Sequence, residues 1–145
     1  MMSSKRLGGH GRRRQQRGRW GVAAVEFAIV APLFFMMVFG CIEFGRALMV
    51  QQILTNASRV GARQAITLNA TEADVIATAG NYAASTSVSG VTVTVTPSPA
   101  AAAAGDMVSV TVAVPFSQVS WIPAPWFMGG TSLDATSVMR KEGFE

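Results

Sequence analysis

The chain has 145 residues, of which 50% are hydrophobic and 14% charged, with a formal net charge of +4 at pH 7. This length allows one modest domain, and the apolar share is higher than a small soluble protein usually carries. The only histidine, His10, lies in a basic segment, and no catalytic triad, metal-spaced ligand cluster or glycine-rich phosphate loop is present. We expect a structural or assembly protein that has no cofactor and is not an enzyme.

Residues 1–21 form a basic segment. It contains no acidic residue, and its basic residues are Lys5, Arg6, Arg12, Arg13, Arg14, Arg17 and Arg19. By the positive-inside rule such a flank stays cytoplasmic, which places the C-terminal part outside. The segment has neither interleaved aromatic residues nor a folded reader, so topology explains its charge better than nucleic-acid binding does. We predict a cytoplasmic leader and no nucleic-acid partner.

Residues 22–42 form an apolar run whose only ionisable side chains are Glu26 and Cys41. About 20 apolar residues cross a hydrocarbon core roughly 30 Å thick, so we predict one transmembrane helix. The run is too long for a cleaved secretory signal. A lipoprotein acylated at Cys41 is a weaker alternative, because Phe39 fits such a motif poorly. Cys41 is better interpreted as a small buried apolar side chain near the outer end of the span.

Glu26 lies about one helical turn inside this predicted span. A carboxylate there costs roughly 2.5 to 3.5 kcal/mol on insertion scales, so it normally has a partner or a function. The alternative is that Glu26 snorkels to the cytoplasmic interface or favours its helix N-terminus.

The helix is expected to continue beyond the span. Apolar residues recur at helical spacing after Glu43, at Val50, Ile53, Leu54, Ala57, Val60 and Gly61. No Pro or Gly cluster separates the two segments, so we predict one helix over residues 22–66, with its transmembrane half at 22–42. Pro32 lies inside the span and can kink the helix.

Residues 67–145 predict a small α+β head. Cap chemistry near Thr71 and the apolar spacing of Ala73, Ile76, Ala77, Gly80 and Ala84 predict a short helix over residues 71–84. Valines alternate with polar residues over 91–96 and 108–114, which predicts an antiparallel pair, and residues 133–140 are a plausible third strand. We expect the long helix to cover the valine face of this sheet.

An aromatic segment with prolines and glycines lies between the predicted strands and contains Trp121, Trp126 and Phe127. Exposed apolar clusters usually mark contacts, so it is a candidate interaction loop. The alternative, which we favour, is that Trp121 and Phe127 fold over the sheet and complete a small core.

The junction at residues 21–27 resembles the type IV prepilin cleavage motif, in which a peptidase cuts after a glycine and a glutamate follows five residues later. Together with three further segments, it is similar to the TadE-like family, whose members are pseudopilins or minor pilins of the tight-adherence (Tad/Flp) pilus machinery. The family-like positions in those segments are Glu43, Arg46, Arg59, Gly61, Arg63, Met139, Arg140 and Glu142.

The resemblance implies a pilin-like fold and cleavage between Gly21 and Val22 by a prepilin peptidase. It also implies that Glu26, next to Phe27, pairs with the N-terminal amine of a neighbouring subunit. The implied location is the bacterial inner membrane, with a single pass, a cytoplasmic N-terminus and a periplasmic or extracellular head, and after assembly the pilus. The implied partners are the peptidase, other Tad pilins and pseudopilins, inner-membrane platform proteins and membrane lipid.

One alternative function stays open from the residues themselves. The chain could be an unprocessed single-pass membrane protein whose outer head is an adhesive or ligand-binding module. Substitution of Glu26 separates the two hypotheses, because only pilus assembly depends on its carboxylate.

Overall fold

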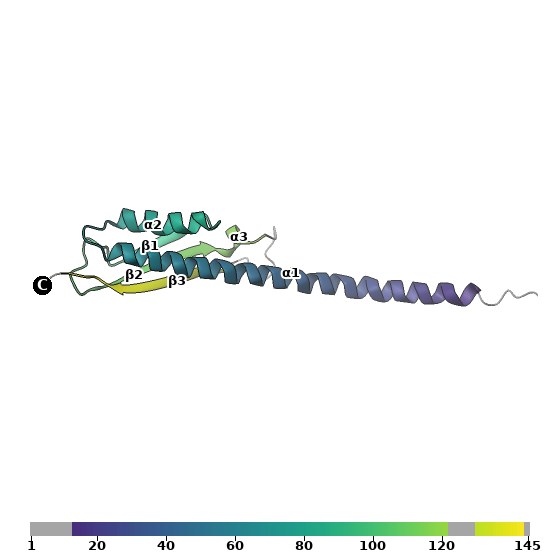
Figure 1. The fold of residues 1–145 in the computed structure, drawn as a ribbon. Coiled ribbons are helices and arrows are strands. Elements are labelled where there is room, and N and C mark those ends of the chain that lie inside the picture. The colour runs from purple at the N-terminus through teal and green to yellow at the C-terminus, as the bar shows by residue number, and fades with distance from the viewer. Residues whose placement is uncertain (1–12, 122–129, 144–145) are drawn as a thin grey trace, which may run out of the picture. The chain divides into compact units, whose positions relative to one another are not determined.

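The computed structural model describes residues 13–121 and 130–143, with side chains from Gly21 onwards (Figure 1). The elements in chain order are α1 (Arg13–Ala65), α2 (Glu72–Ser85), β1 (Thr92–Thr96), β2 (Met107–Pro115), α3 (Phe116–Val119) and β3 (Ser132–Arg140). A long apolar helix, a second helix and an antiparallel sheet confirm the predicted α+β class.

Helix α1 begins at Arg13, earlier than the predicted start at Val22, and ends at Ala65, next to the predicted end. Arg and Gln are good helix formers, so the basic segment does not stop the helix. Pro32 lies inside α1 and does not end it. The chain divides into two compact units, residues 1–41 and 42–145, so the boundary between them falls within this helix.

In the first unit the described side chains of α1 are almost all exposed. From Gly21 to Cys41 only Ala31, Val38 and Gly40 are half-buried, and none is fully buried. Among the described residues, one helix is long and apolar enough to cross a membrane by length and composition, and its most apolar stretch has none of its residues buried in the protein. A helix that is apolar on all sides requires a non-aqueous environment or partners.

In the second unit three antiparallel strands form a sheet in the order β1-β2-β3. Val110 in the central strand lies opposite Val95 of β1 and Ser137 of β3. Every second residue of β2 is buried, namely Val108, Val110, Val112 and Val114. The predicted alternation is therefore confirmed, since successive side chains of a strand point to opposite faces.

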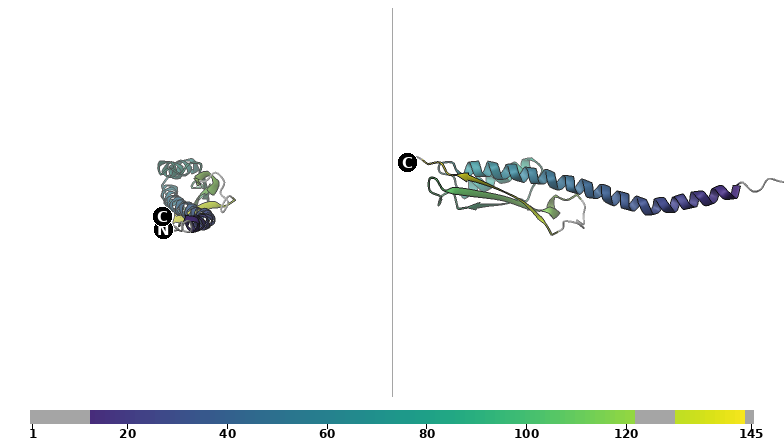
Figure 2. Two further views of the ribbon diagram at one scale, coloured as in Figure 1. Left: turned by 90° about the vertical axis from the view of Figure 1, so that its right-hand side faces the viewer. Right: turned by 90° about the horizontal axis from the view of Figure 1, so that it is seen from below.

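The buried valine face packs against α1 and α2, and Figure 2 shows both helices on the same side of the sheet. The two helices and β2 lie close together at Gly61, where an added Cβ would lie 3.1 Å from both Ala79 Cβ and Val110 Cγ1. Val50, Leu54 and Ala57 of α1 are fully buried, which confirms the predicted amphipathic half of the helix.

Two polar contacts fix α1 along β3. Gln51 Nε2 donates to the backbone oxygen of Asp134 at 2.7 Å. Ser58, which is completely buried, donates through its hydroxyl to Thr55 O, and its oxygen lies 2.8 Å from Ser137 Oγ. Ser58 has one hydroxyl proton, and it donates this proton to Thr55 O. In its contact with Ser137, Ser58 therefore accepts a hydrogen bond from the Ser137 hydroxyl.

Helix α2 begins as predicted but buries a different side. Thr71 is its N-cap and forms a capping box with Asp74. The buried residues are Val75, Ala79 and Ala83, whereas Ile76 of the predicted apolar set is 41% exposed. Alanines occur on both sides of α2, so their spacing did not show which side is buried. The side that contains Ala79 packs at Gly61 of α1.

The short helix α3 was not predicted. It follows β2 directly, and its two apolar residues, Phe116 and Val119, are buried. The backbone N–H of Phe116 donates to Thr131 O at 2.9 Å, next to the start of β3. This helix therefore adds two buried apolar side chains to the core at the end of β2.

Candidate functional site

The residues of the predicted cleavage and assembly site lie on the exposed part of α1. Gly21, Val22, Glu26 and Phe27 are all exposed, Phe27 by 70%. Within residues 21–121 and 130–143, no hydrogen bond is described for the Glu26 carboxylate. A Cβ added at Gly21 would have no atom within 4 Å. The backbone here is thus open to a close approach, and the carboxylate is open to a partner outside the chain.

A second group of predicted residues lies further along α1, where the helix contacts residues 119–121. The side chains of Glu43 and Arg46 hold the backbone of residues 119–121, which leads into the aromatic segment. Arg46 Nε donates to Val119 O at 3.0 Å. Glu43 accepts at Oε2 from Ser120 Oγ at 2.8 Å and at Oε1 from the Trp121 backbone N–H at 3.1 Å. We call these two side chains the Glu43–Arg46 clamp.

The geometry of the clamp follows from helix spacing. Residues three apart lie on the same face of a helix, so both charged side chains reach one segment. The Arg46 guanidinium also lies over the Trp121 ring, 5.1 Å from its centroid, in a cation–π arrangement. Both clamp residues are half-buried, and hydrogen bonds to charged groups are stronger than neutral ones. The clamp therefore fixes the position of Trp121.

Trp121 does not fold over the sheet. Its side chain is 70% exposed, so the favoured interpretation that it completes the core is wrong for this residue. Phe116 and Val119 fill the core at this end instead. Trp126 and Phe127 lie outside the described residues, and their predicted part in an interaction loop stays a prediction.

The remaining family-like positions of α1 are divided between surface and core. Arg59 and Arg63 are exposed, whereas Gly61 is buried at the meeting point of α1, α2 and β2. Gly61 is a packing residue, because any larger side chain would push α2 and the sheet away. Cys41, predicted as a small buried side chain, is exposed in the chain.

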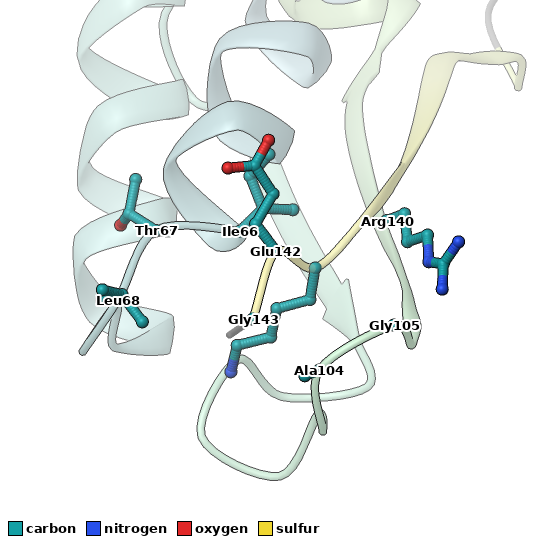
Figure 3. A pocket seen from close by; sticks show the side chains of 9 residues that line it. Ile66, Thr67, Leu68, Ala104, Gly105, Arg140, Glu142 and Gly143 are labelled. Carbon is teal, nitrogen blue, oxygen red and sulfur yellow. The ribbon is translucent and has the colours of Figure 1, made fainter. Parts of the chain in front are cut away.

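The C-terminal family-like residues lie at the C-terminal end of β3 and just after it. Within the head, this end of the strand is remote from Trp121. Met139 packs against the core, and Arg140 and Glu142 are exposed. Arg140 and Glu142 border an open hollow of about 930 Å³, also lined by residues 66–68, 104 and 105. Figure 3 shows these residues around the hollow, with Arg140 on the side of Gly105. Both polar and apolar residues line the hollow, but among the described residues no cluster of metal ligands lies there.

Lys141, between these residues, has a structural role that sequence reasoning missed. Its ammonium donates to the backbone oxygens of Pro99 and Ala102 in the link between β1 and β2. Its backbone also pairs with Gly105 and Asp106. The only signal in the sequence was its place inside the family-like terminal segment. Among the described residues, no group of three or more His, Cys, Asp or Glu could hold a metal ion.

Taken together, a long apolar N-terminal helix followed by a second helix and a three-stranded antiparallel sheet packed against the long helix defines a pilin-like α+β protein. Residues 21–63 match the family model described as TadE-like protein, which confirms the resemblance over this part of the chain. The match begins at Gly21 and includes both residues of the Glu43–Arg46 clamp. No curated protein and no solved structure matches the chain.

Proposed function

We propose that this chain is a pseudopilin or minor pilin of a Tad/Flp pilus. Its precursor is held in the bacterial inner membrane with the basic leader in the cytoplasm and the head outside. A prepilin peptidase cuts between Gly21 and Val22, and the mature chain joins or primes the pilus with other Tad pilins and platform proteins. The observation that carries this proposal is a family match that starts at Gly21, together with an exposed carboxylate, Glu26, on an exposed apolar helix.

The chemistry of assembly depends on Glu26. Cleavage creates a free amine on Val22 and removes the basic leader. Glu26 is four positions after Val22, so the amine and the carboxylate lie at the same end of the helix, within about one turn. Opposite charges attract far more strongly in a low-dielectric setting than on a wet surface. The resemblance to type IV pilins implies that the amine of one subunit pairs with Glu26 of its neighbour, and this pairing sets the register between their helices.

Processing is tested by N-terminal sequencing of the protein coexpressed with its prepilin peptidase. The wild-type chain should begin at Val22, and Gly21→Val should keep residues 1–21, because a side chain blocks close approach to the backbone. Gly40→Val is the matched control, since Gly40 is also a helical glycine with no atom within 4 Å of an added Cβ. An intact leader on the wild-type chain would overturn the proposal.

The alternative function is an unprocessed membrane protein with a binding or adhesive head, and the exposed Trp121 is the observation that favours it. Glu26→Gln separates the two functions. It should abolish incorporation into pili while the precursor still inserts, whereas Glu72→Gln, at an exposed head position, should assemble normally. Normal assembly of Glu26→Gln would remove the pairing mechanism and leave the alternative.

A further inference from the structure

The exposed apolar surface of α1 does not stop at the predicted end of the span. Ile42, Phe44, Leu48 and Met49 belong to the head unit, yet all are between 44% and 61% exposed. With Trp121 they form a set that we call the basal collar. The next exposed residues of α1 are all polar or charged, namely Gln52, Asn56, Arg59 and Arg63. The exposed surface therefore changes from apolar to polar between Met49 and Gln52.

The directions in which the collar side chains of α1 point indicate whether lipid or a protein partner covers them. At about 100° per residue, Phe44 and Met49 point about 140° apart around the helix axis, and Leu48 lies between them. The opposite side of the helix is occupied by the head, through Ala47 and Val50. A protein partner covers one face of a helix, whereas lipid surrounds every direction that the protein leaves open. The spread of the collar thus favours lipid over a second copy of the chain.

The length of the exposed apolar surface fits the same occupant. Residues 22–49 are 28 positions, about 42 Å of helix at ~1.5 Å per residue. A hydrocarbon core is about 30 Å thick, but the bilayer with its headgroup layers is about 40 to 45 Å thick. With Val22 placed at the inner edge of the bilayer, the apolar surface ends at Met49 near the outer edge of the headgroup layer, beyond the edge of the hydrocarbon.

The residues near this end have the chemistry of a membrane interface. Tryptophan is enriched at headgroup depth, where its ring is apolar and its N–H can remain hydrated. The ionisable side chains of residues 42–49, Glu43 and Arg46, are hydrogen-bonded to residues 119–121. Their polar groups are thus partly satisfied by protein, which lowers the cost of placing them there.

We propose that the basal collar lies in the headgroup layer of the outer leaflet, with Trp121 fixed at that depth by the Glu43–Arg46 clamp. The membrane boundary is then between Met49 and Gln52, seven or more residues beyond the predicted Ile42. The collar holds the base of the head on the lipid surface while the chain is in the membrane. This inference rests on the membrane insertion in the proposed function and requires neither cleavage nor pilus assembly.

The test measures the depth of Trp121 in the full-length chain reconstituted at high dilution in phosphatidylcholine vesicles. Trp20→Phe with Trp126→Phe leaves Trp121 as the only tryptophan. Two controls in a background that also carries Trp121→Phe calibrate the depth: Phe39→Trp in the span, and Leu68→Trp at a head position that is 68% exposed. Fluorescence is quenched by lipids brominated near the carboxyl end or near the methyl end of the acyl chain, and by acrylamide from water.

We expect Trp121 to be quenched most by bromine near the carboxyl end, with an emission maximum between those of the two controls. Quenching that matches the Leu68→Trp control would overturn the proposal. Protection from both bromine and acrylamide that increases with protein density would also overturn it, in favour of a second copy.

Flotation with the vesicles and N-terminal sequencing keep the two proposals distinguishable. A chain that floats and is cleaved but keeps Trp121 in water refutes only the collar. A chain that shows the expected depth but is never cleaved refutes only the processing in the proposed function. A chain that does not float refutes both.

Discussion

The two parts of helix α1 differ in how their side chains are covered, although they belong to one helix. From Gly21 to Cys41 no side chain is fully buried, whereas from Ala47 to Ala65 the helix has a buried face that contains Val50 and Leu54. Both parts satisfy their backbone hydrogen bonds internally, so helix formation does not distinguish them. The difference lies in what surrounds the side chains.

The physical reason for the difference is the distribution of apolar residues around the axis. The first part is apolar on all sides and has no polar face to present to water. The second part is amphipathic, and the valine face of the sheet covers its apolar side. Helical stability in water comes mainly from such tertiary packing of one face. Matched substitutions in the two parts should therefore have unequal effects on the head.

The largest difference is expected between the variants Leu54→Ala and Leu33→Ala. Leu54 is completely buried and Leu33 is 70% exposed. Truncation of a buried leucine costs about 2 to 5 kcal/mol of the free energy of unfolding, because contacts are lost and a cavity remains. Urea unfolding of the detergent-solubilised chain, followed by near-UV circular dichroism, should show this loss for Leu54→Ala and almost none for Leu33→Ala. Similar losses in both would contradict the comparison.

A smaller difference is expected for two helical glycines. A Cβ at Gly61 would lie 3.1 Å from atoms of Ala79 and Val110, whereas at Gly40 it would meet nothing within 4 Å. Valine at position 61 adds further carbons to a packed junction, and such overpacking costs about 1 to 3 kcal/mol. In the same unfolding measurement, Gly61→Val should lower the stability of the head and Gly40→Val should not. A head that tolerates valine at position 61 would mean that α2 moves freely against α1.

The smallest effect concerns the start of α2 and depends on pH. Hydrogen bonds from the Thr71 hydroxyl and backbone N–H lower the pKa of Asp74 below its usual range. Because the folded-state pKa is the lower one, the stabilisation is complete above the unfolded pKa of about 3.9 and is lost as pH falls through the folded value. Asp74→Asn should reduce stability at neutral pH, and its difference from wild type should shrink in acid.

The control for this effect is Glu72→Gln, which removes a charge in the same helical turn without breaking the capping box. Because the capping box stays intact, it should lower stability at neutral pH less than Asp74→Asn does. A difference between Asp74→Asn and wild type that stays constant with pH would contradict the assigned role of the carboxylate. The helix content of α1, which has no acidic residue in its first turn, should be unaffected by either variant.

Much of the head was predictable because its signals are local. The valines of β2 alternate with smaller or polar residues, and the spacing of Val50, Leu54 and Ala57 fits one face of a helix. The side of α2 that packs could not be predicted, since alanines occur on several sides of it. The core residues of α3 were also missed, because a helix this short has too little periodicity to detect.

The clamp shows the limit of the sequence most directly. Glu43, Arg46 and Trp121 were each singled out, but the bonds that join the helix to residues 119–121 span 73 to 78 positions of the chain. No local pattern reports a contact at that separation. The exposure of Trp121 follows from it, because the clamp holds the backbone of this residue at the side of α1.

By itself the sequence determined the apolar helix, the alternation of the strands and the likeness to TadE-like proteins, all of which are carried by spacing and by residue type along one segment. The tertiary structure decided which side of α2 is buried, why position 61 is a glycine, where Trp121 points and where the exposed surface of α1 changes from apolar to polar. These depend on which distant elements meet, and only the packed chain brings them together.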